Sequence, residues 1–426
     1  MARLVQKFGG SSVKDSEHIQ KVARIVANTY REGKELVVVV SAMGDSTDQL
    51  IDLATQISSS PDPRELDVLL ATGEQVSISM LAMALQSLGL KARSFTGPQA
   101  GILTDDTHGF ARIKTVHPTR IEAALRAGEI AVVAGFQGMT RSSELTTLGR
   151  GGSDTTAVAL AAALKAECCD IYTDVDGVYS TDPRTVPDAR RLRAISYEEM
   201  LSLSSHGAQV LNARSVELAM KNKVPIRLRS TFAPHDTGTL VTTRELTPDY
   251  QICGVACDSA RVWAHMSLGQ NFAIEAKLDE TRQQAVEKLL DKLEQTGLNR
   301  QNILCRKSDS LNVSEIEINC EKRILRSLQS ILDSASQDFP NSQPRIDSSV
   351  ASISLIGKGV QAERSLRTEL IKTLSKADVP VTMLGADELS ISAIVPEMLK
   401  DKAIRAVHDR FCQETFSTEM KTIVRI

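Results

Sequence analysis

The stretch TTLGRGGSDTTAVALAAAL, residues 146–164, places an arginine, a glycine pair and an acid directly before an alanine- and leucine-rich helix. The guanidinium of Arg150 is a rigid fork of donors that suits a carboxylate, and the positive end of the helix dipole favours negative charge nearby. Ser153 and Asp154 stand where a helix cap belongs, so capping is their simplest interpretation. Because capping does not account for Arg150, the pattern predicts an anion-binding site where this helix begins.

Glycine or an acid also follows several apolar runs, in KFGGSS (7–12), VSAMGDSTD (40–48), AGFQG (134–138) and TDVDGVYSTDPR (173–184). Glycine lets a backbone approach a ligand closely, and successive amides in such turns can hold phosphate oxygens. One such turn is usually only a tight turn. Because all of these would open on one edge of a parallel sheet, together they indicate phosphate binding.

The elements that must position these residues follow an α/β pattern from residue 1 to 232. Continuous apolar runs, such as 35–43, 129–136 and 168–175, predict buried strands, and 16–33 and 65–89 predict helices between them. This alternation is typical of a mainly parallel sheet covered by helices on both faces, which binds ligands beyond the carboxyl ends of its strands. The polar, turn-rich segment 233–250 is predicted to be a linker.

The second half has another order of elements, strand, helix, two strands and helix, and it occurs twice. The first copy occupies 251–345 and the second 346–426, which predicts two small α+β modules of the ferredoxin-like type. The final KTIVRI, residues 421–426, could be a strand that returns to complete the first module.

Composition narrows the class of partner. The 426-residue chain has a formal net charge of −3, which offers no general attraction for nucleic acid or an anionic membrane, so small molecules are the expected partners. Its seven cysteines have no zinc-ligand spacing and are interpreted as reduced thiols of a cytoplasmic protein. The N-terminus has no signal-peptide core, and no segment approaches about 20 apolar residues.

Several phosphate-binding classes are also disfavoured. The chain contains no GxxxxGK[ST] motif and no HRD or DFG element, which disfavours P-loop enzymes and protein kinases. A GxGxxG motif after the first strand is missing as well, which disfavours a dinucleotide oxidoreductase.

The ordered motifs of the first half resemble those of the aspartate kinases, members of the amino-acid kinase family. The matching stretches are VQKFGGSSV (5–13), VVVVSAMGDSTD (37–48), ATGEQVS (71–77), SFTGPQAGILT (94–104), AVVAGFQG (131–138), 146–164 and IYTDVDGVYSTDPR (171–184). The resemblance implies transfer of the ATP γ-phosphoryl group to the side-chain carboxylate of L-aspartate, the first step towards lysine and threonine. It also implies Mg²⁺ with the ATP, no tightly bound cofactor, C-terminal ACT modules that can bind an amino-acid effector, and a homodimer or higher homo-oligomer.

The resemblance also assigns roles to residues. Lys7 and Asp154 are implied as the catalytic pair. The implied substrate-binding residues are Ser41, Thr47, Glu74, Arg150 and Ser153, with Glu74 suited to the substrate ammonium. The implied nucleotide-binding residues are Lys7, Gly9, Gly10, Ser11, Thr173, Asp174, Tyr179 and Arg184. No protein ligand is assigned to the metal.

This chain departs from the family pattern at two places. Where the family commonly reads GAKVLHPRSVE, residues 207–217 read GAQVLNARSVE, so Gln209 replaces a cation expected near the nucleotide, and Asn212 and Ala213 are expected to alter packing. Both ACT modules lack the usual Pro-Gly turn, which predicts altered or lost feedback by lysine and threonine. Two alternatives remain: another phosphate-forming kinase of this fold, acting for example on acetylglutamate, and a non-catalytic ACT-containing paralogue that serves as a regulatory or oligomerisation partner.

Overall fold

The computed structural model describes residues 2–208, 210–247, 252–268, 276–296, 298, 302–307, 313–339, 342–360 and 364–412. Contacts divide the chain into two compact units, each of which is described by itself. The first unit comprises Met1–Val178, Arg191–Ser204 and Gln209–Pro248. The second comprises Tyr179–Arg190, Ser205–Ala208 and Asp249–Ile426. Gln209, predicted to replace a cation near the nucleotide, and residues 421–426, predicted to form a last strand, lie outside the described residues.

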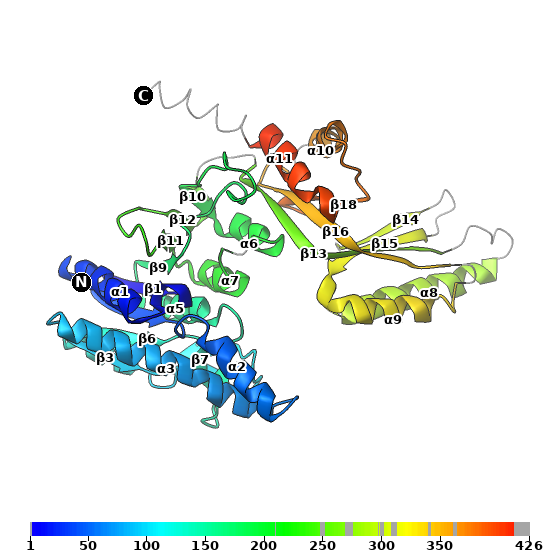
Figure 1. The fold of residues 1–426 in the computed structure, drawn as a ribbon. Helices are drawn as coiled ribbons and strands as arrows, with labels where there is room; N and C mark the ends of the chain where they lie inside the picture. Colours follow the sequence, from blue (N-terminus) through cyan, green and yellow to red (C-terminus); the bar gives the residue numbers. More distant parts are fainter. Residues whose placement is uncertain are drawn as a thin grey trace, which may run out of the picture. The chain divides into compact units, whose positions relative to one another are not determined.

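The first unit is built on an eight-stranded sheet with the order β10-β12-β11-β9-β1-β2-β6-β3 (Figure 1). All neighbours in it are parallel except β11 and β12, which confirms the predicted α/β class. Its strands are β1 (Arg3–Phe8), β2 (Glu35–Val40), β3 (Ala92–Phe95), β6 (Ile130–Ala134), β9 (Cys168–Thr173), β10 (Ala194–Ser196), β11 (Ile226–Ser230) and β12 (Thr239–Thr242). The strand β12 lies inside the range predicted as a linker.

Helices cover this sheet on both faces. They are α1 (Ser16–Arg31), α2 (Ser46–Ile57), α3 (Pro63–Ser87), α4 (Thr119–Arg126), α5 (Gly152–Leu164), α6 (Tyr197–Ser205) and α7 (Ala213–Asn222). Leu4 and Phe8 of β1 pack in one core cluster with apolar residues of α1 and α3. Because side chains alternate between the faces of a strand, Lys7 points to the other face, where α5 packs against β1.

A second, four-stranded sheet completes the first unit and was not predicted. It has the order β5-β4-β7-β8 and consists of β4 (Ile102–Thr104), β5 (Ile113–Val116), β7 (Gln137–Met139) and β8 (Leu145–Thr147). The hairpin of β7 and β8 is antiparallel. It matters for function because β8 leads directly into the turn that carries Arg150.

The second unit contains one six-stranded antiparallel sheet with the order β14-β15-β13-β16-β18-β17. Two copies of strand, helix, two strands and helix follow one another, as the sequence predicts. The first consists of β13 (Gly254–Ser267), α8 (Ala276–Gln295), β14 (Ile303–Lys307), β15 (Val313–Glu321) and α9 (Leu325–Ala335), and the second of β16 (Arg345–Ile356), α10 (Arg364–Lys376), β17 (Met383–Ala386), β18 (Ser390–Pro396) and α11 (Lys400–Phe411). The copies share the sheet because β13 pairs with β16.

The helix α3 is long and apolar enough to cross a membrane by length and composition alone. In the fold, however, it buries one side against the sheet, including Leu70, Ile78, Leu81 and Leu85. This burial, and the buried carboxylate of Glu74 within the same helix, are typical of the core helix of a globular domain.

Candidate active site

The glycine- and acid-rich turns follow four consecutive parallel strands, β9, β1, β2 and β6. The carboxyl ends of parallel strands meet at one edge of a sheet, so the prediction that these turns open on a common edge is confirmed. The turn after β1 is a 3₁₀ helix, η1 (Gly10–Val13). Its entry is held by a hydrogen bond from the Gly9 N–H to the Tyr172 carbonyl of β9 (3.3 Å).

Lys7 and Asp154 meet at this edge. The Lys7 Nζ lies 2.6 Å from the Asp154 Oδ1, and the two side chains are 11% and 12% exposed. The ammonium comes from the end of β1 and the carboxylate from the first turn of α5. This ion pair holds the Lys7 ammonium in a fixed position close to the N-terminus of α5. The helix dipole favours an anion at the same place.

The first turn of α5 differs from the predicted cap. The helix begins at Gly152, its N-cap is Gly151 with φ of 74°, and no side chain of the described residues caps it. Ser153 and Asp154 therefore belong to the helix itself, and both are buried. Their position depends on Gly135, since a Cβ there would lie 2.6 Å from the Ser153 Oγ.

Ser41 directly follows β2, and the helix α2 that comes next carries Thr47 in its first turn. Opposite this strand end lies Glu74 of α3, only 2% exposed. The Ala42 N–H donates to the Glu74 Oε1 (3.0 Å), while the buried Oε2 has no hydrogen-bond partner among the described residues. Burial raises the pKa of the Glu74 carboxyl to about 7.

The turn at Gly10 fits closely against the turn that follows β2. A Cβ on Gly10 would lie 2.9 Å from the Ala42 carbonyl oxygen, and the Gly44 N–H donates to the Gly10 carbonyl (3.1 Å). Only glycine allows this approach without displacing backbone. Ser11 is exposed in the same turn, so its hydroxyl can reach a ligand at this edge.

Arg150 lies on the turn between β8 and α5. Its side chain is exposed, and its guanidinium makes no hydrogen bond or ion pair within the described part of the chain. The Arg150 carbonyl accepts a hydrogen bond from the Asn212 Nδ2 (2.9 Å). The replacement at residue 212 was expected to alter packing, and the structure adds a polar contact to the turn that carries Arg150.

The predicted nucleotide-binding residues divide between the two units. Thr173, at the end of β9, donates from its hydroxyl to the Asp174 Oδ1 (2.9 Å) in the first unit. Tyr179 and Arg184 belong to the second unit. Arg184 forms a bidentate pair with Asp182, which lowers the pKa of that carboxyl.

The segment Tyr179–Arg190 packs within the second unit through polar contacts that sequence reasoning missed. The Val255 N–H donates to the Ser180 carbonyl (2.7 Å), and the Ser180 Oγ lies 2.9 Å from the Nε2 of the buried His408. The Arg405 Nε donates to the Thr185 carbonyl (3.1 Å). Residues 179–184 of the motif 171–184 therefore belong to the second unit, where they are attached to β13 and α11.

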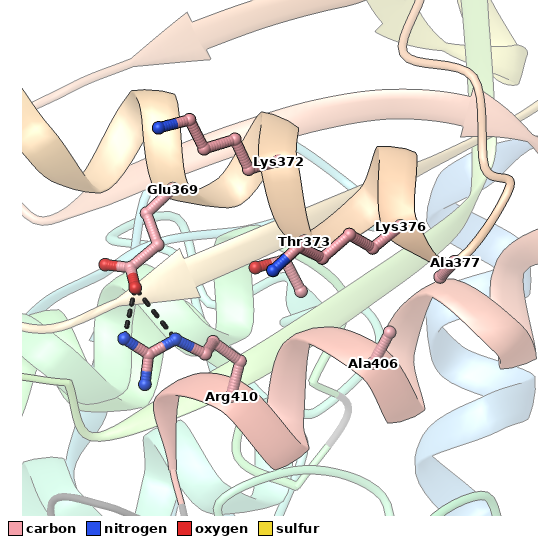
Figure 2. Close-up of a pocket in the computed structure, with 7 residues that line it drawn as sticks. All are labelled: Glu369, Lys372, Thr373, Lys376, Ala377, Ala406 and Arg410. Carbon is pink, nitrogen blue, oxygen red and sulfur yellow. Dashed lines mark hydrogen bonds and ion pairs between the residues drawn. The ribbon is translucent and has the colours of Figure 1, made fainter.

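A groove of about 310 Å³ lies between α10 and α11 of the second unit (Figure 2). Its charged lining consists of Glu369, Lys372, Lys376 and Arg410. The Arg410 guanidinium is paired with the Glu369 carboxylate, as the dashed lines of Figure 2 show. None of the residues predicted to bind substrate or nucleotide lines this groove.

Cysteine and metal-ligand chemistry do not add a second candidate site. All seven cysteines are free. Within the described ranges, no group of three or more His, Cys, Asp or Glu side chains is arranged to hold a metal ion.

Comparison with known proteins identifies the family of both parts of the chain. The amino acid kinase family matches residues 2–230, and the ACT domain matches residues 353–411. The aspartokinase of Mycolicibacterium smegmatis is 41% identical over 422 residues, which is 96% of each chain. The aspartate kinase of Pseudomonas putida is 41% identical over 413 residues, 96% of this chain and 98% of that one.

Solved structures show the same fold. Aspartokinase III of E. coli, in complex with aspartate and ADP, aligns with a TM-score of 0.77 and 23% identity, covering 95% of this chain and 99% of that one. The aspartate kinase of Synechocystis aligns with a TM-score of 0.53 and 35% identity, covering 96% of this chain and 69% of that one. With the paired lysine and carboxylate at the strand ends, the family match and the full-length identity, the chain belongs to the aspartokinases of the amino acid kinase family.

Proposed function

We propose that the protein transfers the γ-phosphoryl group of ATP to the side-chain carboxylate of L-aspartate, giving 4-phospho-L-aspartate and ADP. The observation that carries this proposal is the Lys7–Asp154 pair, with its 2.6 Å contact at the edge where β1 ends and α5 begins. The exposed guanidinium of Arg150 on the adjoining turn, which pairs with no described residue, supplies a partner for a substrate carboxylate.

The proposed chemistry requires no general base. A carboxylate with a reference pKa of about 3.9 is ionised at neutral pH, so its oxygen can attack the γ-phosphorus directly. The bond from that phosphorus to the bridging β,γ-oxygen breaks, and ADP leaves with the electron pair. Lys7 neutralises charge on the phosphoryl oxygens, and Asp154 holds the ammonium in place. Catalysis then consists of positioning and charge neutralisation.

In this proposal the substrate is recognised by its charged groups. Arg150 and Ser153 hold a carboxylate at the start of α5, where the helix dipole also favours an anion. The buried Oε2 of Glu74, which has no hydrogen-bond partner among the described residues, accepts a hydrogen bond from the substrate ammonium. Ser41 and Thr47 complete the pocket with hydroxyl groups. An acetylated amino group could not form the charged contact with Glu74, which disfavours acetylglutamate as the substrate.

Replacing Glu74 with glutamine is expected to raise the KM for aspartate by about 10- to 100-fold, because a charge-assisted hydrogen bond contributes about 1.5–3 kcal/mol.

The raised pKa of Glu74 also predicts that the KM of the wild-type protein for aspartate depends on pH. Below pH 7 the Glu74 carboxyl binds a proton that the substrate ammonium must displace, so the KM for aspartate should fall as the pH rises through about 7. Steady-state kinetics between pH 6 and 8 measure both effects.

The matched control for Glu74 is Glu65, an exposed acid in the first turn of the same helix. Glu65→Gln should keep both the wild-type KM and its pH dependence. The role of Glu74 is rejected if Glu74→Gln retains the wild-type pH dependence of the KM for aspartate.

On the nucleotide side, we propose that Gly9, Gly10 and Ser11 contact the phosphates, and that Thr173 and Asp174 contact the rest of ATP. Contacts with ATP by Tyr179 and Arg184, two residues of the second unit, stay predictions from the family resemblance. Mg²⁺ enters with ATP, because this ion keeps several waters and binds mainly through substrate phosphates. The free cysteines favour a cytoplasmic setting for the reaction.

The experiment that tests the function is trapping of the acyl phosphate as its hydroxamate in the presence of ATP, Mg²⁺ and hydroxylamine. Product should form with L-aspartate and not with acetylglutamate. Folded protein that binds ATP but forms no hydroxamate with L-aspartate would disprove the proposed reaction. In that case the non-catalytic paralogue becomes the better interpretation.

We also propose that feedback by lysine and threonine is weakened or lost, because neither ACT module has a Pro-Gly pair at its first turn. The first of these turns, 269–275, lies outside the described residues. The same trapping assay, repeated with lysine and threonine singly and together at millimolar concentration, should show little inhibition. Strong cooperative inhibition would contradict this part of the proposal.

We also expect the protein to be a homodimer or a higher homo-oligomer, as the family resemblance implies. Light scattering would test this expectation.

A further inference from the structure

The turn that carries Arg150 is unusually constrained. Gly149 and Gly151 flank Arg150 with φ of 76° and 74°, a left-handed conformation that favours glycine. A Cβ on Gly149 would lie 2.7 Å from the ring of Phe110, and a Cβ on Gly151 would lie 2.3 Å from the Asn212 Nδ2. Side chains from two distant segments therefore hold the turn between them.

One of these segments is the start of α7. Asn212 is the N-cap of this helix, and its Oδ1 accepts a hydrogen bond from the Arg214 N–H (3.0 Å). The same side chain donates from Nδ2 to the Arg150 carbonyl (2.9 Å). The Arg214 Nη1 reaches the Leu148 carbonyl (3.4 Å). The amide of Asn212 accepts a hydrogen bond at the cap with its oxygen and donates one to the turn with its nitrogen. Neither a hydroxyl of serine length nor a carboxylate can make both hydrogen bonds here.

The other segment is anchored by a buried carboxylate. Asp67, 1% exposed, accepts hydrogen bonds from the Thr147 hydroxyl (2.5 Å) and the Gly109 N–H (3.1 Å), and its Oδ2 lies 2.7 Å from the His108 Nδ1. These contacts fix the loop that carries Phe110 against the end of β8. Since that side of the turn is fixed, the contact from Asn212 determines where the Arg150 backbone lies on the other side.

We propose that Asn212 is a positioning residue for substrate binding, acting through the Arg150 carbonyl. The inference rests on the proposed role of Arg150 in binding the aspartate carboxylate. Because the Arg150 guanidinium has no partner in the described part of the chain, its direction depends on the backbone from which the side chain extends. Displacement of a binding group by about 1 Å is enough to lower catalytic efficiency strongly.

The test separates the two functions of Asn212. Asn212→Ser retains a good N-cap but lacks the donor to Arg150, whereas Asn212→Ala loses both. For Asn212→Ser we expect a KM for aspartate raised about three- to tenfold, a KM for ATP unchanged within about twofold, and a Tm close to that of the wild type. Asn212→Ala should show the same KM for aspartate and a lower Tm.

A double-mutant cycle with Arg150→Ala completes the test. Arg150→Ala should raise the KM for aspartate, and adding Asn212→Ser to it should produce no further increase, because the two changes act through one contact. If Arg150→Ala leaves this KM unchanged, the proposed role of Arg150 is wrong. If Arg150→Ala raises it and Asn212→Ser does not, or if Asn212→Ser raises both KM values equally, the positioning role of Asn212 is overturned.

Discussion

Replacing Lys7 with methionine is expected to lower kcat for hydroxamate formation by about 10²- to 10³-fold, the loss typical of removing one preorganised charge or donor from a transition state. Methionine keeps most of the length and apolar character of the side chain, so the change removes mainly the ammonium. The KM for aspartate should change little, because Arg150 and Glu74 hold that substrate. Steady-state and single-turnover kinetics with ATP and L-aspartate measure this effect.

Lys7→Met also leaves the nearly buried Asp154 carboxylate without its partner, which lowers stability by itself. The double variant Lys7→Met/Asp154→Asn removes that charge and should recover much of the Tm without recovering kcat. The matched control is Lys21→Met, since Lys21 is exposed on α1 and pairs only with Glu17 at 2.8 Å among the described residues. A kcat for Lys7→Met within about threefold of the wild type would contradict the catalytic role of Lys7.

The sequence was sufficient to predict the elements that place Lys7. The continuous apolar runs of β2, β6 and β9 identify strands that are buried on both faces, and the turns that follow them lie on one edge because the strands are parallel. The pairing of Lys7 with Asp154 was implied by the family resemblance. The spacing of residues alone could not predict this pair, because Lys7 and Asp154 are far apart in the sequence and meet only when α5 packs on β1.

Other features could not be predicted for physical reasons. The strands β4, β7 and β8 have three residues each, too few for an alternating pattern to be recognised. The capping interpretation of Ser153 and Asp154 failed because Gly151 takes the cap position. The hydrogen bond from Asn212 to Arg150 depends on tertiary packing of α7, which no local signal encodes.

The sequence also could not predict that the motif 171–184 is divided between two units. Thr173 is part of β9, whereas the segment from Tyr179 is attached to the second unit through Ser180 and its contacts with Val255 and His408. A run of turn residues indicates where a chain changes direction, but not which sheet or helix it will pack against.

Replacing Gly135 with alanine is expected to reduce kcat/KM for aspartate by about a hundredfold, although this residue carries no side chain. The added Cβ would lie 2.6 Å from the Cβ and Oγ of Ser153 and 2.9 Å from its Cα. Because the Cα belongs to the first turn of α5, the clash cannot be relieved by a rotamer change alone. Ser153 and Asp154 must shift away from Lys7 and from the substrate carboxylate. Overpacking of this kind also lowers the free energy of unfolding by about 1–3 kcal/mol.

Gly385→Ala in β17 is the matched control, since a Cβ there would meet no described atom within 4 Å and the residue does not have a positive φ. Gly135 also lacks a positive φ, so any effect of Gly135→Ala comes from the contact with Ser153 and not from backbone strain. Kinetics and thermal unfolding of both variants measure the result. If Gly135→Ala unfolds at a lower temperature yet keeps the wild-type kcat/KM, the first turn of α5 does not hold the substrate, and the site must be placed elsewhere on the edge formed by β9, β1, β2 and β6.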